Sequence, residues 1–342
     1  MKRLTLLMVF VFLACFVGCG SKESIKTPNA PAAKSNVQKT VADPGPKSVP
    51  PSVSETEGIE LRYRFVEGQR MDYIMSMETD NDIINLSQKT KNNMDFYFHV
   101  TVDAVEADGS AVITQINDRF KLKVKGPGGT ITYDSADGEE SDHPQWQGLR
   151  QVYLPMQYAQ CTYRVAPSGV VSDVKPTAEL AERLEKDPSM AGILSQNQLE
   201  QNAFALFHPM PAEAVAPGAT WNYPRNVAMG PLKLEFVFTK TFRATAEQEG
   251  RQVVDITETV VSKKIGEGTP AFDYTLDDEK TFGQEYFDPQ LGWLVSMNDR
   301  TVHRTKQGAA GGVGIAVESH SSTQITIQLQ PSVTPQKPSP VK

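Results

Sequence analysis

Five carboxylates crowd into the short stretch between residues 134 and 142. They belong to Asp134, Asp137, Glu139, Glu140 and Asp142, arranged around a single glycine. Carboxylate oxygens at this density are the ligands that a hard cation such as Ca²⁺ prefers. The spacing differs from that of an EF-hand loop, however, and an exposed loop whose like charges repel one another is the simpler interpretation. The stretch is therefore a candidate cation loop with an acidic surface loop as its alternative.

Three methionines and a tyrosine alternate with other residues between positions 71 and 77. Met71, Tyr73, Met75 and Met77 would share one face of a strand, because successive side chains of a strand point to opposite faces. Methionine is flexible and polarisable, so this face suits the wall of an adaptable lipid site. Methionine also fills ordinary irregular cores. The four residues are a candidate ligand wall, with core packing as the alternative.

The residue types that most often carry catalysis are scattered along the chain. The five histidines lack the HxH, HxxxH and HExxH spacings of zinc sites. No Gly-x-Ser-x-Gly elbow, phosphate loop or dinucleotide fingerprint occurs. Cys161 stands in an alternating apolar stretch without a nearby histidine, which indicates a buried strand residue rather than a nucleophile. The sequence thus predicts no enzyme, no cofactor and no metal.

Cys19 offers a different chemistry, the acylation of its thiol. It follows two cations, an unbroken apolar run from Leu4 to Val17, and Gly18. The run is roughly 14 residues long, short for a membrane span of about 20, and it ends in small residues as secretory signals do. The stretch resembles a bacterial lipoprotein signal, which implies cleavage before Cys19 and lipidation of that residue. Cys15 as the modified residue, an uncleaved anchor and ordinary secretion are the alternatives.

This resemblance implies a protein anchored to the membrane of the cell envelope by acyl chains, in which each buried methylene contributes about 0.8 kcal/mol. In a cell with two membranes it implies the outer membrane, facing the periplasm, because Gly20 stands where an aspartate would resemble an inner-membrane retention signal. The net charge of −7 argues against nucleic-acid binding. With Cys15 removed and Cys19 acylated, Cys161 is left alone and no internal disulfide is expected.

The domain that must position these residues lies between two segments without a core. After the signal at 1–18, residues 19–58 are rich in proline, serine and lysine and hold almost no large apolar side chains. They predict a disordered tether, because such a segment buries too little surface to offset its ordering entropy. Residues 331–342 have the same composition and predict a disordered tail.

Period-two alternation dominates residues 59–330. It is clearest at 71–77, 96–102, 120–124, 232–238 and 313–329. Turn residues at 107–109, 249–250 and 308–312 stand between alternating runs. One apolar face and one polar face per run is the pattern of antiparallel strands with a single buried side.

One region has the helical period instead. Pro176 and Thr177 open a run with Leu180 and Leu184 four residues apart, Pro188 interrupts it, and a second run covers 189–207. We therefore expect a mainly β protein with two related halves. β half one (59–175) and β half two (208–330) would each be a curved antiparallel sheet of about four to six strands, joined by a helical connector at 176–207.

The two halves share three short sequence motifs, which occur in the same order. The pairs are 68–73 with 218–223, 107–113 with 249–254, and 163–172 with 286–296. Similar motifs in the same order in both halves predict a degenerate internal duplication. The Gly-x-x-Trp-x-Tyr and Asp-Pro-x-x-Gly-Trp phrases are also similar to those of an uncharacterised family of β-rich bacterial envelope lipoproteins. That resemblance would cover 59–330 and implies a fold and a location without an activity.

Three functions fit these observations. The first is a non-catalytic binding or carrier lipoprotein that holds an apolar or amphipathic envelope ligand, such as a lipid, against a curved sheet. The second is an assembly or scaffold lipoprotein that presents its sheet faces or edges to protein partners. The third is a hydrolase with dispersed residues, which a cleft holding a histidine in contact with two carboxylates would favour.

Overall fold

The computed structural model describes residues 58–137, 142–143, 146–191, 193–229, 232–264, 272–307 and 317–331. The signal at 1–18, Cys19, nearly all of the tether, the turn at 308–312 and residues 332–342 lie outside this part of the chain. What the sequence predicts for those residues stays a prediction. Among the described residues, no helix is long and apolar enough to cross a membrane.

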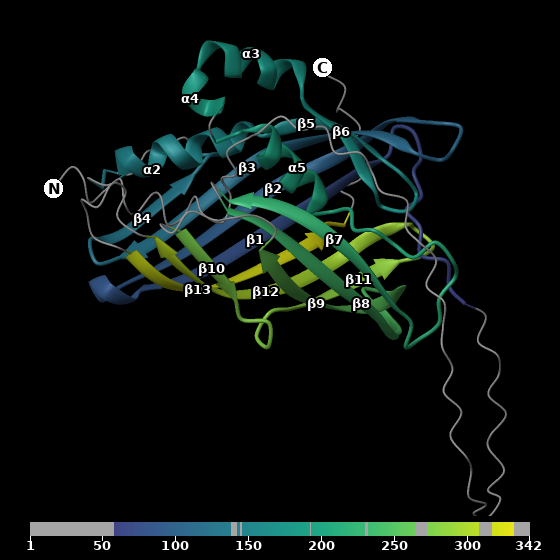
Figure 1. Ribbon diagram of the computed structural model, residues 1–342. Helices are drawn as coiled ribbons and strands as arrows, with labels where there is room; N and C mark the ends of the chain where they lie inside the picture. Colours follow the sequence, from purple (N-terminus) through teal and green to yellow (C-terminus); the bar gives the residue numbers. More distant parts are fainter. Residues whose placement is uncertain are drawn as a thin grey trace, which may run out of the picture.

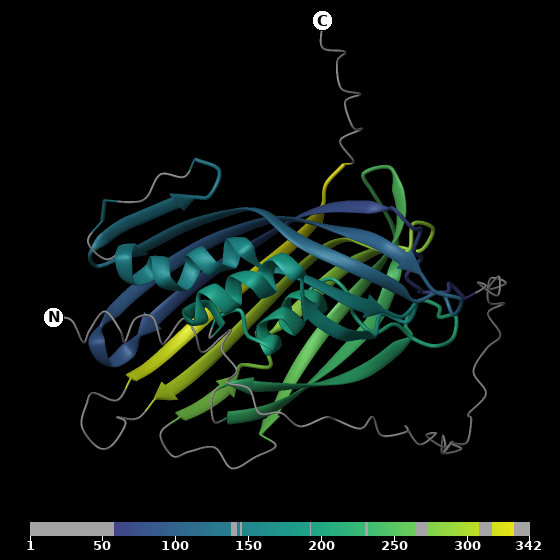
Figure 2. The same cartoon turned by 90° about the horizontal axis from the view of Figure 1, so that it is seen from above.

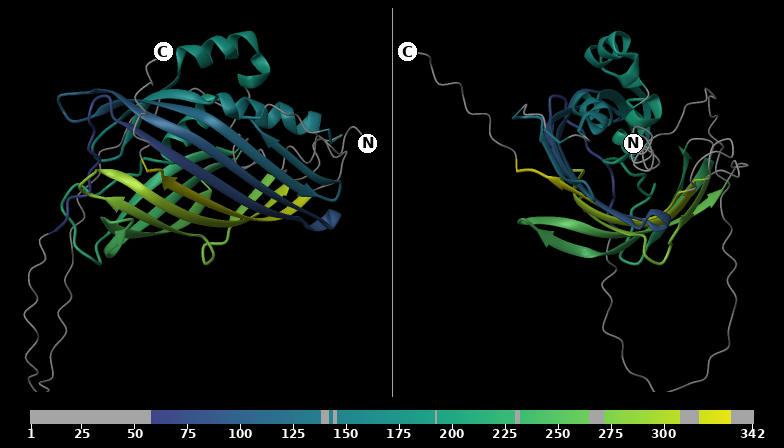
Figure 3. Two further views of the ribbon diagram at one scale, coloured as in Figure 1. Left: turned by 180° about the vertical axis from the view of Figure 1, so that it is seen from behind. Right: turned by 90° about the vertical axis from the view of Figure 1, so that its left-hand side faces the viewer.

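The strands form one antiparallel sheet that curves into a trough (Figure 1; Figure 3). This confirms the mainly β fold. The strands of the first half are β1 (Arg70–Ile83), β2 (Gln88–Val105), β3 (Ala111–Gly126), β4 (Gly129–Asp134), β5 (Gln160–Val165) and β6 (Val171–Pro176). Those of the second half are β7 (Thr220–Met229), β8 (Leu232–Gln248), β9 (Arg251–Lys264), β10 (Phe272–Leu276), β11 (Phe282–Asp288), β12 (Trp293–Gln307) and β13 (Val317–Leu329).

The two halves meet edge to edge within this sheet. The strand order is β6-β5-β3-β2-β1-β13-β12-β11-β9-β8-β7, so β1 and β13 form the seam. Their antiparallel register runs from Tyr73 opposite Leu329 to Ile83 opposite Ser319. The sequence predicted a connection through helices and gave no sign of this seam. Pairing there satisfies two rows of backbone N–H and C=O groups that free strand edges would leave open.

The helices lie in the trough, against the strands of the first half (Figure 2). The connector forms as predicted, as α3 (Ala178–Lys186), α4 (Pro188–Ala191) and α5 (Gln196–Phe204). Thr177 and Ser195 begin α3 and α5 by accepting hydrogen bonds from the backbone N–H of Leu180 and Gln198. Three short helices fall outside the prediction: η1 (Ile84–Leu86), α2 (Trp146–Tyr153) and η2 (Leu154–Tyr158). None of the three is long enough to show a helical period in sequence.

The phrases shared by the two halves adopt the same backbone geometry. The glycines at 68 and 218, 109 and 250, and 169 and 292 all have φ between +75° and +92°. The N–H of Gly68 donates to Val102 at 2.8 Å, and that of Gly218 donates to Phe242 at 2.7 Å. β2 and β8 each carry a bulge directly after that acceptor. Positions in the two halves can therefore be matched strand by strand from these bulges.

A segment before β1 ties the ends of both halves together. The backbone N–H of Tyr63 donates to Pro167 at 2.9 Å, that of Arg64 donates to Gly292 at 3.3 Å, and the indole of Trp293 donates to Arg64 at 3.1 Å. The segment passes so close that a Cβ on Gly292 would lie 2.5 Å from the backbone nitrogen of Arg64. Glycine is needed there for space as well as for its positive φ.

Candidate functional site

A cavity of about 270 Å³ opens on the trough side of the second half. Its apolar wall consists of Phe236 and Phe238 from β8, Val260 from β9, and Tyr274 and Leu276 from β10. These residues form a hydrophobic cluster separate from the main core under the helices. The second half therefore contributes an apolar wall that is separate from the main core.

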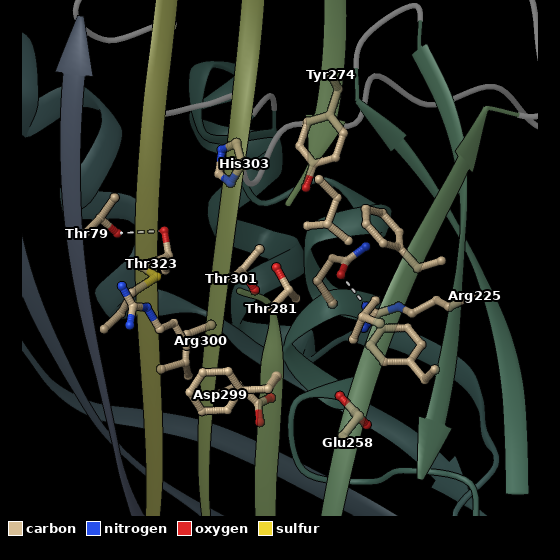
Figure 4. A pocket seen from close by; sticks show the side chains of 18 of the residues that line it. Thr79, Arg225, Glu258, Tyr274, Thr281, Asp299, Arg300, Thr301, His303 and Thr323 are labelled. Carbon is tan, nitrogen blue, oxygen red and sulfur yellow. Dashed lines mark hydrogen bonds between the residues drawn. The ribbon is translucent and has the colours of Figure 1, made fainter. Parts of the chain in front are cut away.

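Polar and charged side chains line the rest of the cavity (Figure 4). Thr79 and Thr323 share a hydrogen bond of 3.2 Å across the seam between the halves. His303 and Tyr274 stack at one end, with ring centroids 5.2 Å apart. Glu258 and Asp299 lie together at the other end (Figure 4). We call these two residues the carboxylate end.

A buried charge cluster lies behind the carboxylate end. We define it as Lys240, Glu258, Glu285 and His208. The ammonium of Lys240 donates to Oε2 of Glu285 at 2.6 Å and lies 3.4 Å from Oε2 of Glu258. His208 Nδ1 lies 2.6 Å from Oε1 of Glu285. Lys240 is 0% exposed, so its charge is held entirely by protein groups.

These contacts hold Glu285 ionised. Burial alone raises the pKa of Glu285, but the charges of His208 and Lys240 outweigh it and lower that pKa to about 2. Tyr223 donates its hydroxyl to Glu258 at 3.2 Å. Burial, followed by the charges of Glu258 and Glu285, raises the pKa of this phenol well above its usual value. The cluster is thus a set of mutually compensated charges.

The cluster brings a histidine into contact with two carboxylates, the arrangement that would favour a hydrolase. His208, Glu258 and Glu285 also have ligand atoms close enough for a metal ion. Lys240 Nζ, however, bonds Glu285 and lies 2.8 Å from His208 Nδ1, so an ammonium takes the position of a cation. Of these three residues only Glu258 lines the cavity in the described structure. The geometry of the cluster provides charge neutralisation.

Asp299 differs from its neighbours because its charge is not compensated. Its Oδ1 is buried and forms no hydrogen bond within the described part of the chain. Burial, followed by the charges of Glu258 and Glu285, raises its pKa well above the usual value, and Lys240 only partly opposes this. The surroundings of Asp299 therefore favour its protonated form more than water does.

Arg225 reaches the cavity from β7. Its guanidinium donates to Oε1 of Gln201 on α5 and lies over the ring of Phe204, 4.6 Å from the centroid. Burial lowers the pKa of Arg225 to about 10, which keeps it charged at neutral pH. Arg225 therefore contacts the helical cover and the cavity at once.

The candidate ligand wall in β1 divides between core and cavity. Met77 lines the 270 Å³ cavity, and Met75 and Met77 line a smaller one of about 40 Å³ beneath α5. Met71 and Tyr73 are buried in the main core. The hydroxyl of Tyr73 donates to Leu294 at 3.0 Å. Met77 is also buried in the main core. The ligand wall therefore stays a prediction, and Met75 and Met77 are its members that line cavities.

The structure describes only part of the acidic stretch. Asp134 ends β4 and accepts from Nε of Arg119 at 2.8 Å, with Lys121 3.6 Å away. Arg119 in particular lowers the pKa of Asp134 to about 2. This carboxylate is thus already paired with two cations. Glu139 and Glu140 lie outside the described residues, so the cation loop stays a prediction.

The sequence analysis also singled out Cys161 and Cys19. Cys161 is buried in β5, as predicted, and burial raises its thiol pKa to about 12. Cys19 lies outside the described residues. The structure also assembles Asp72, His99 and Asp118 on neighbouring strands, which the sequence did not predict. Arg70 bonds Asp72 at 2.7 Å there, so that group is already neutralised by a guanidinium.

Sequence reasoning missed the charge cluster because its members come from separate strands. Lys240, Glu258 and Glu285 each stand within an alternating run at the inward parity. A charged residue at an apolar position of an amphipathic strand was the available signal. His208 follows the helical connector and has no local pattern at all. Pairing these residues requires the register of β8, β9 and β11, which the sequence does not specify.

No protein-family model matches the sequence, and no curated protein matches it at a significant level. Among solved structures, the chain is similar to lipovitellin, described in terms of lipid–protein interactions, with 7% identity and a TM-score of 0.41 over 78% of this chain. This match spans 26% of the lipovitellin chain.

Two other solved structures are similar at a lower level. An outer membrane channel from Pseudomonas putida has 7% identity and a TM-score of 0.24, with 83% of this chain and 100% of that chain covered. A putative outer membrane lipoprotein-sorting protein domain from Vibrio parahaemolyticus has 11% identity and a TM-score of 0.14, with 77% and 87% covered. Likenesses at this level are limited to a large β sheet, and no function is taken from them.

Proposed function

We propose that this chain is a lipid-anchored envelope lipoprotein that binds an apolar or amphipathic ligand without chemical turnover. The observation that carries the proposal is the 270 Å³ cavity, which has an apolar wall on one side and polar groups on the other. A site with this division suits a molecule that has a hydrocarbon part and a polar head. The lipoprotein signal that ends at Cys19 supports the envelope location.

The apolar wall is large enough to hold a short acyl chain. Each methylene transferred from water contributes about 0.8 kcal/mol, so eight carbons contribute about 6 kcal/mol before the costs of association. Phe236 and Phe238 offer adjacent aromatic surfaces, with ring centroids 6.4 Å apart. Met75 and Met77 extend the apolar surface toward α5, and methionine adapts readily to ligand shape.

The first half supports this assignment by contrast. Its trough side is filled by the helices and by its own side chains, which form the main core. In the second half, the apolar cluster of β8–β10 stands apart from that core and adjoins the cavity, which α5 reaches through Gln201. An apolar cluster beside a cavity is what a ligand-binding sheet requires.

The test is a titration of the full-length chain with 1-octanol, followed by calorimetry. Val260→Trp places a large ring in the cavity and should weaken octanol binding more than tenfold. Val261→Trp, on the opposite face where Val261 is 48% exposed, is the matched control and should bind octanol as the unaltered chain does. Equal octanol affinity in all three proteins, or no binding in any of them, would refute the proposal.

The lipid anchor is tested separately. Cys19→Ser should leave the folded domain intact and move the protein from the membrane fraction to the soluble fraction. Residence in the membrane with an intact amino terminus would contradict lipidation at Cys19. That outcome would leave the cavity proposal standing.

The scaffold alternative has less support from the sheet edges. The two outermost strands are β6 and β7. Pro176 ends β6 and Pro224 interrupts β7, and proline lacks the N–H that strand addition by a partner would use. In-cell crosslinking that gives a defined protein adduct through β6 or β7 would favour the scaffold instead.

A further inference from the structure

The carboxylate end has a geometry that follows from one glycine. Gly283 in β11 stands between Glu258 in β9 and Asp299 in β12, directly paired with each. A Cβ on Gly283 would lie 2.3 Å from Oδ1 of Asp299 and 3.2 Å from Cβ of Glu258. The carboxyl of Asp299 therefore extends over Gly283 toward the adjacent carboxylate. The missing side chain brings two acidic groups together at one end of the cavity.

The two acids differ in what compensates them. Glu258 has Lys240 at 3.4 Å and the hydroxyl of Tyr223 at 3.2 Å. Among the described residues, no cation forms an ion pair with Asp299, and its buried Oδ1 has no donor. The next residue along β12, Arg300, is exposed. The groups that act on Asp299 are the carboxylates of Glu258 and Glu285 and the single ammonium of Lys240.

This arrangement lacks one positive charge. On the proposed function described above, which this inference extends, we propose that Asp299 binds an ammonium group at the head of the amphipathic ligand. The ammonium would donate to Oδ1 of Asp299, and the hydrocarbon part would lie along Phe238 and Val260. The remaining N–H groups would face Glu258, so both acids at this end would be compensated.

An anionic head group fits this end poorly. It would meet two carboxyl groups at the closest approach and would gain no free ammonium, because Lys240 is fully buried behind Glu258. Arg225 and Arg300 are the other cations of the cavity wall. Arg225 is already engaged with Gln201 and Phe204, and Arg300 is exposed to solvent. Like charges at short range in a buried site are strongly unfavourable.

Binding should release a proton. In the free protein, burial and the neighbouring carboxylates raise the pKa of Asp299 and so favour its protonated form. An ammonium beside it stabilises the carboxylate form, so the carboxyl proton passes to solvent as the ion pair forms. The affinity for an ammonium ligand should therefore increase as the pH rises toward the raised pKa of Asp299, by up to about tenfold per pH unit.

The experiment uses three probes with the same eight-carbon chain: octylammonium, 1-octanol and octanoate. The unaltered full-length chain is titrated calorimetrically with each at pH 7, in two buffers of different ionisation enthalpy. We expect octylammonium to bind about tenfold or more tightly than octanol. Its binding should release protons, whereas octanol binding should release none.

Two variants separate the head group from the chain. Asp299→Asn keeps the shape and removes the acid, and Gly283→Ala displaces the acid with a methyl group. Each should reduce the preference for octylammonium over octanol to about twofold or less. The pH dependence of octylammonium binding should also disappear in both variants.

The outcomes are distinct. Equal binding of octylammonium and octanol to the unaltered chain would overturn the head-group inference and leave the apolar site intact. Tightest binding by octanoate, or an amine preference that survives Asp299→Asn, would also overturn it. Failure of all three probes to bind would overturn the proposed function together with this inference.

Discussion

The two halves of the sheet place different residues at matched positions. Counting from the bulges in β2 and β8, Val100 corresponds to Lys240, Gln115 to Glu258 and Tyr163 to Glu285. The first half builds its strands with a valine, an amide and a phenol at positions where the second half buries three charges. The first half shows that this sheet geometry forms without the charges. The charge cluster is therefore better explained by the adjoining cavity than by the fold.

A second matched pair shows how the difference arises. Tyr73 stacks on Phe98 in the first half, and Tyr223 stacks on Phe238 at the corresponding position of the second. Tyr73 donates to a backbone carbonyl, whereas Tyr223 donates to the carboxylate of Glu258. The stacked pair of aromatic rings is common to both halves, and the two pairs differ in the group that accepts the hydrogen bond of the tyrosine hydroxyl.

The largest effect should come from breaking the charge cluster. Lys240→Val leaves Glu258 and Glu285 buried without their ammonium and should cost about 3–5 kcal/mol in the free energy of unfolding. The combined variant with Lys240→Val, Glu258→Gln and Glu285→Tyr imitates the first half and should recover most of that loss. Urea denaturation measures both. A combined variant less stable than Lys240→Val would show that the halves are not interchangeable at these positions.

The turn glycines give the next effect. Gly169→Ala and Gly292→Ala place a methyl within 2.2 Å of the carbonyl oxygen of His208 and 2.5 Å of Arg64, respectively. Each should cost about 2–5 kcal/mol. The matched controls Gly68→Ala and Gly218→Ala have no atom within 4 Å and should cost only the left-handed strain of about 1–2 kcal/mol. Thermal unfolding at neutral pH that gave one cost for all four would contradict the packing of the 59–66 segment.

The pH dependence of stability should include a contribution from His303, which lines the cavity. Burial lowers the pKa of His303 to about 4, below its ordinary value of about 6.5. Its neutral form therefore favours the folded state fully above pH 6.5, and about 3 kcal/mol is lost as the pH falls from 6.5 to 4. His303→Phe should flatten this part of the curve, and His320→Gln should flatten it only in part, because His320 is the smaller cause of the lowered pKa of His303. Identical curves for His303→Phe and the unaltered chain would refute the assignment.

The smallest effects belong to the matched tyrosines. Tyr73→Phe removes a hydrogen bond to a neutral carbonyl and should cost about 1 kcal/mol. Tyr223→Phe removes one to a buried carboxylate and should cost about 2 kcal/mol. Chemical denaturation of the two variants compares them directly. An equal or reversed order would show that Glu258 does not depend on its phenol donor.

The sequence predicted the fold better than the site, for a physical reason. Alternation over 71–77 and 232–238 reports which face of a strand is buried, and Thr177 with Pro188 reports where a helix begins and where it stops. The seam between β1 and β13 and the row from Glu258 through Gly283 to Asp299 depend on register between distant strands. Local patterns do not carry that register. Met77 was predicted as a ligand-wall residue from side-chain chemistry. It lines the cavity beside Ile325, its partner on β13 across the seam.

The central claim is that the cavity of the second half holds a ligand, and native mass spectrometry of the full-length protein purified from its own cells tests it most directly. The account predicts an additional small-molecule mass on the unaltered chain and on Val261→Trp, and its loss from Val260→Trp. The same mass on all three proteins, or on none of them, would contradict it.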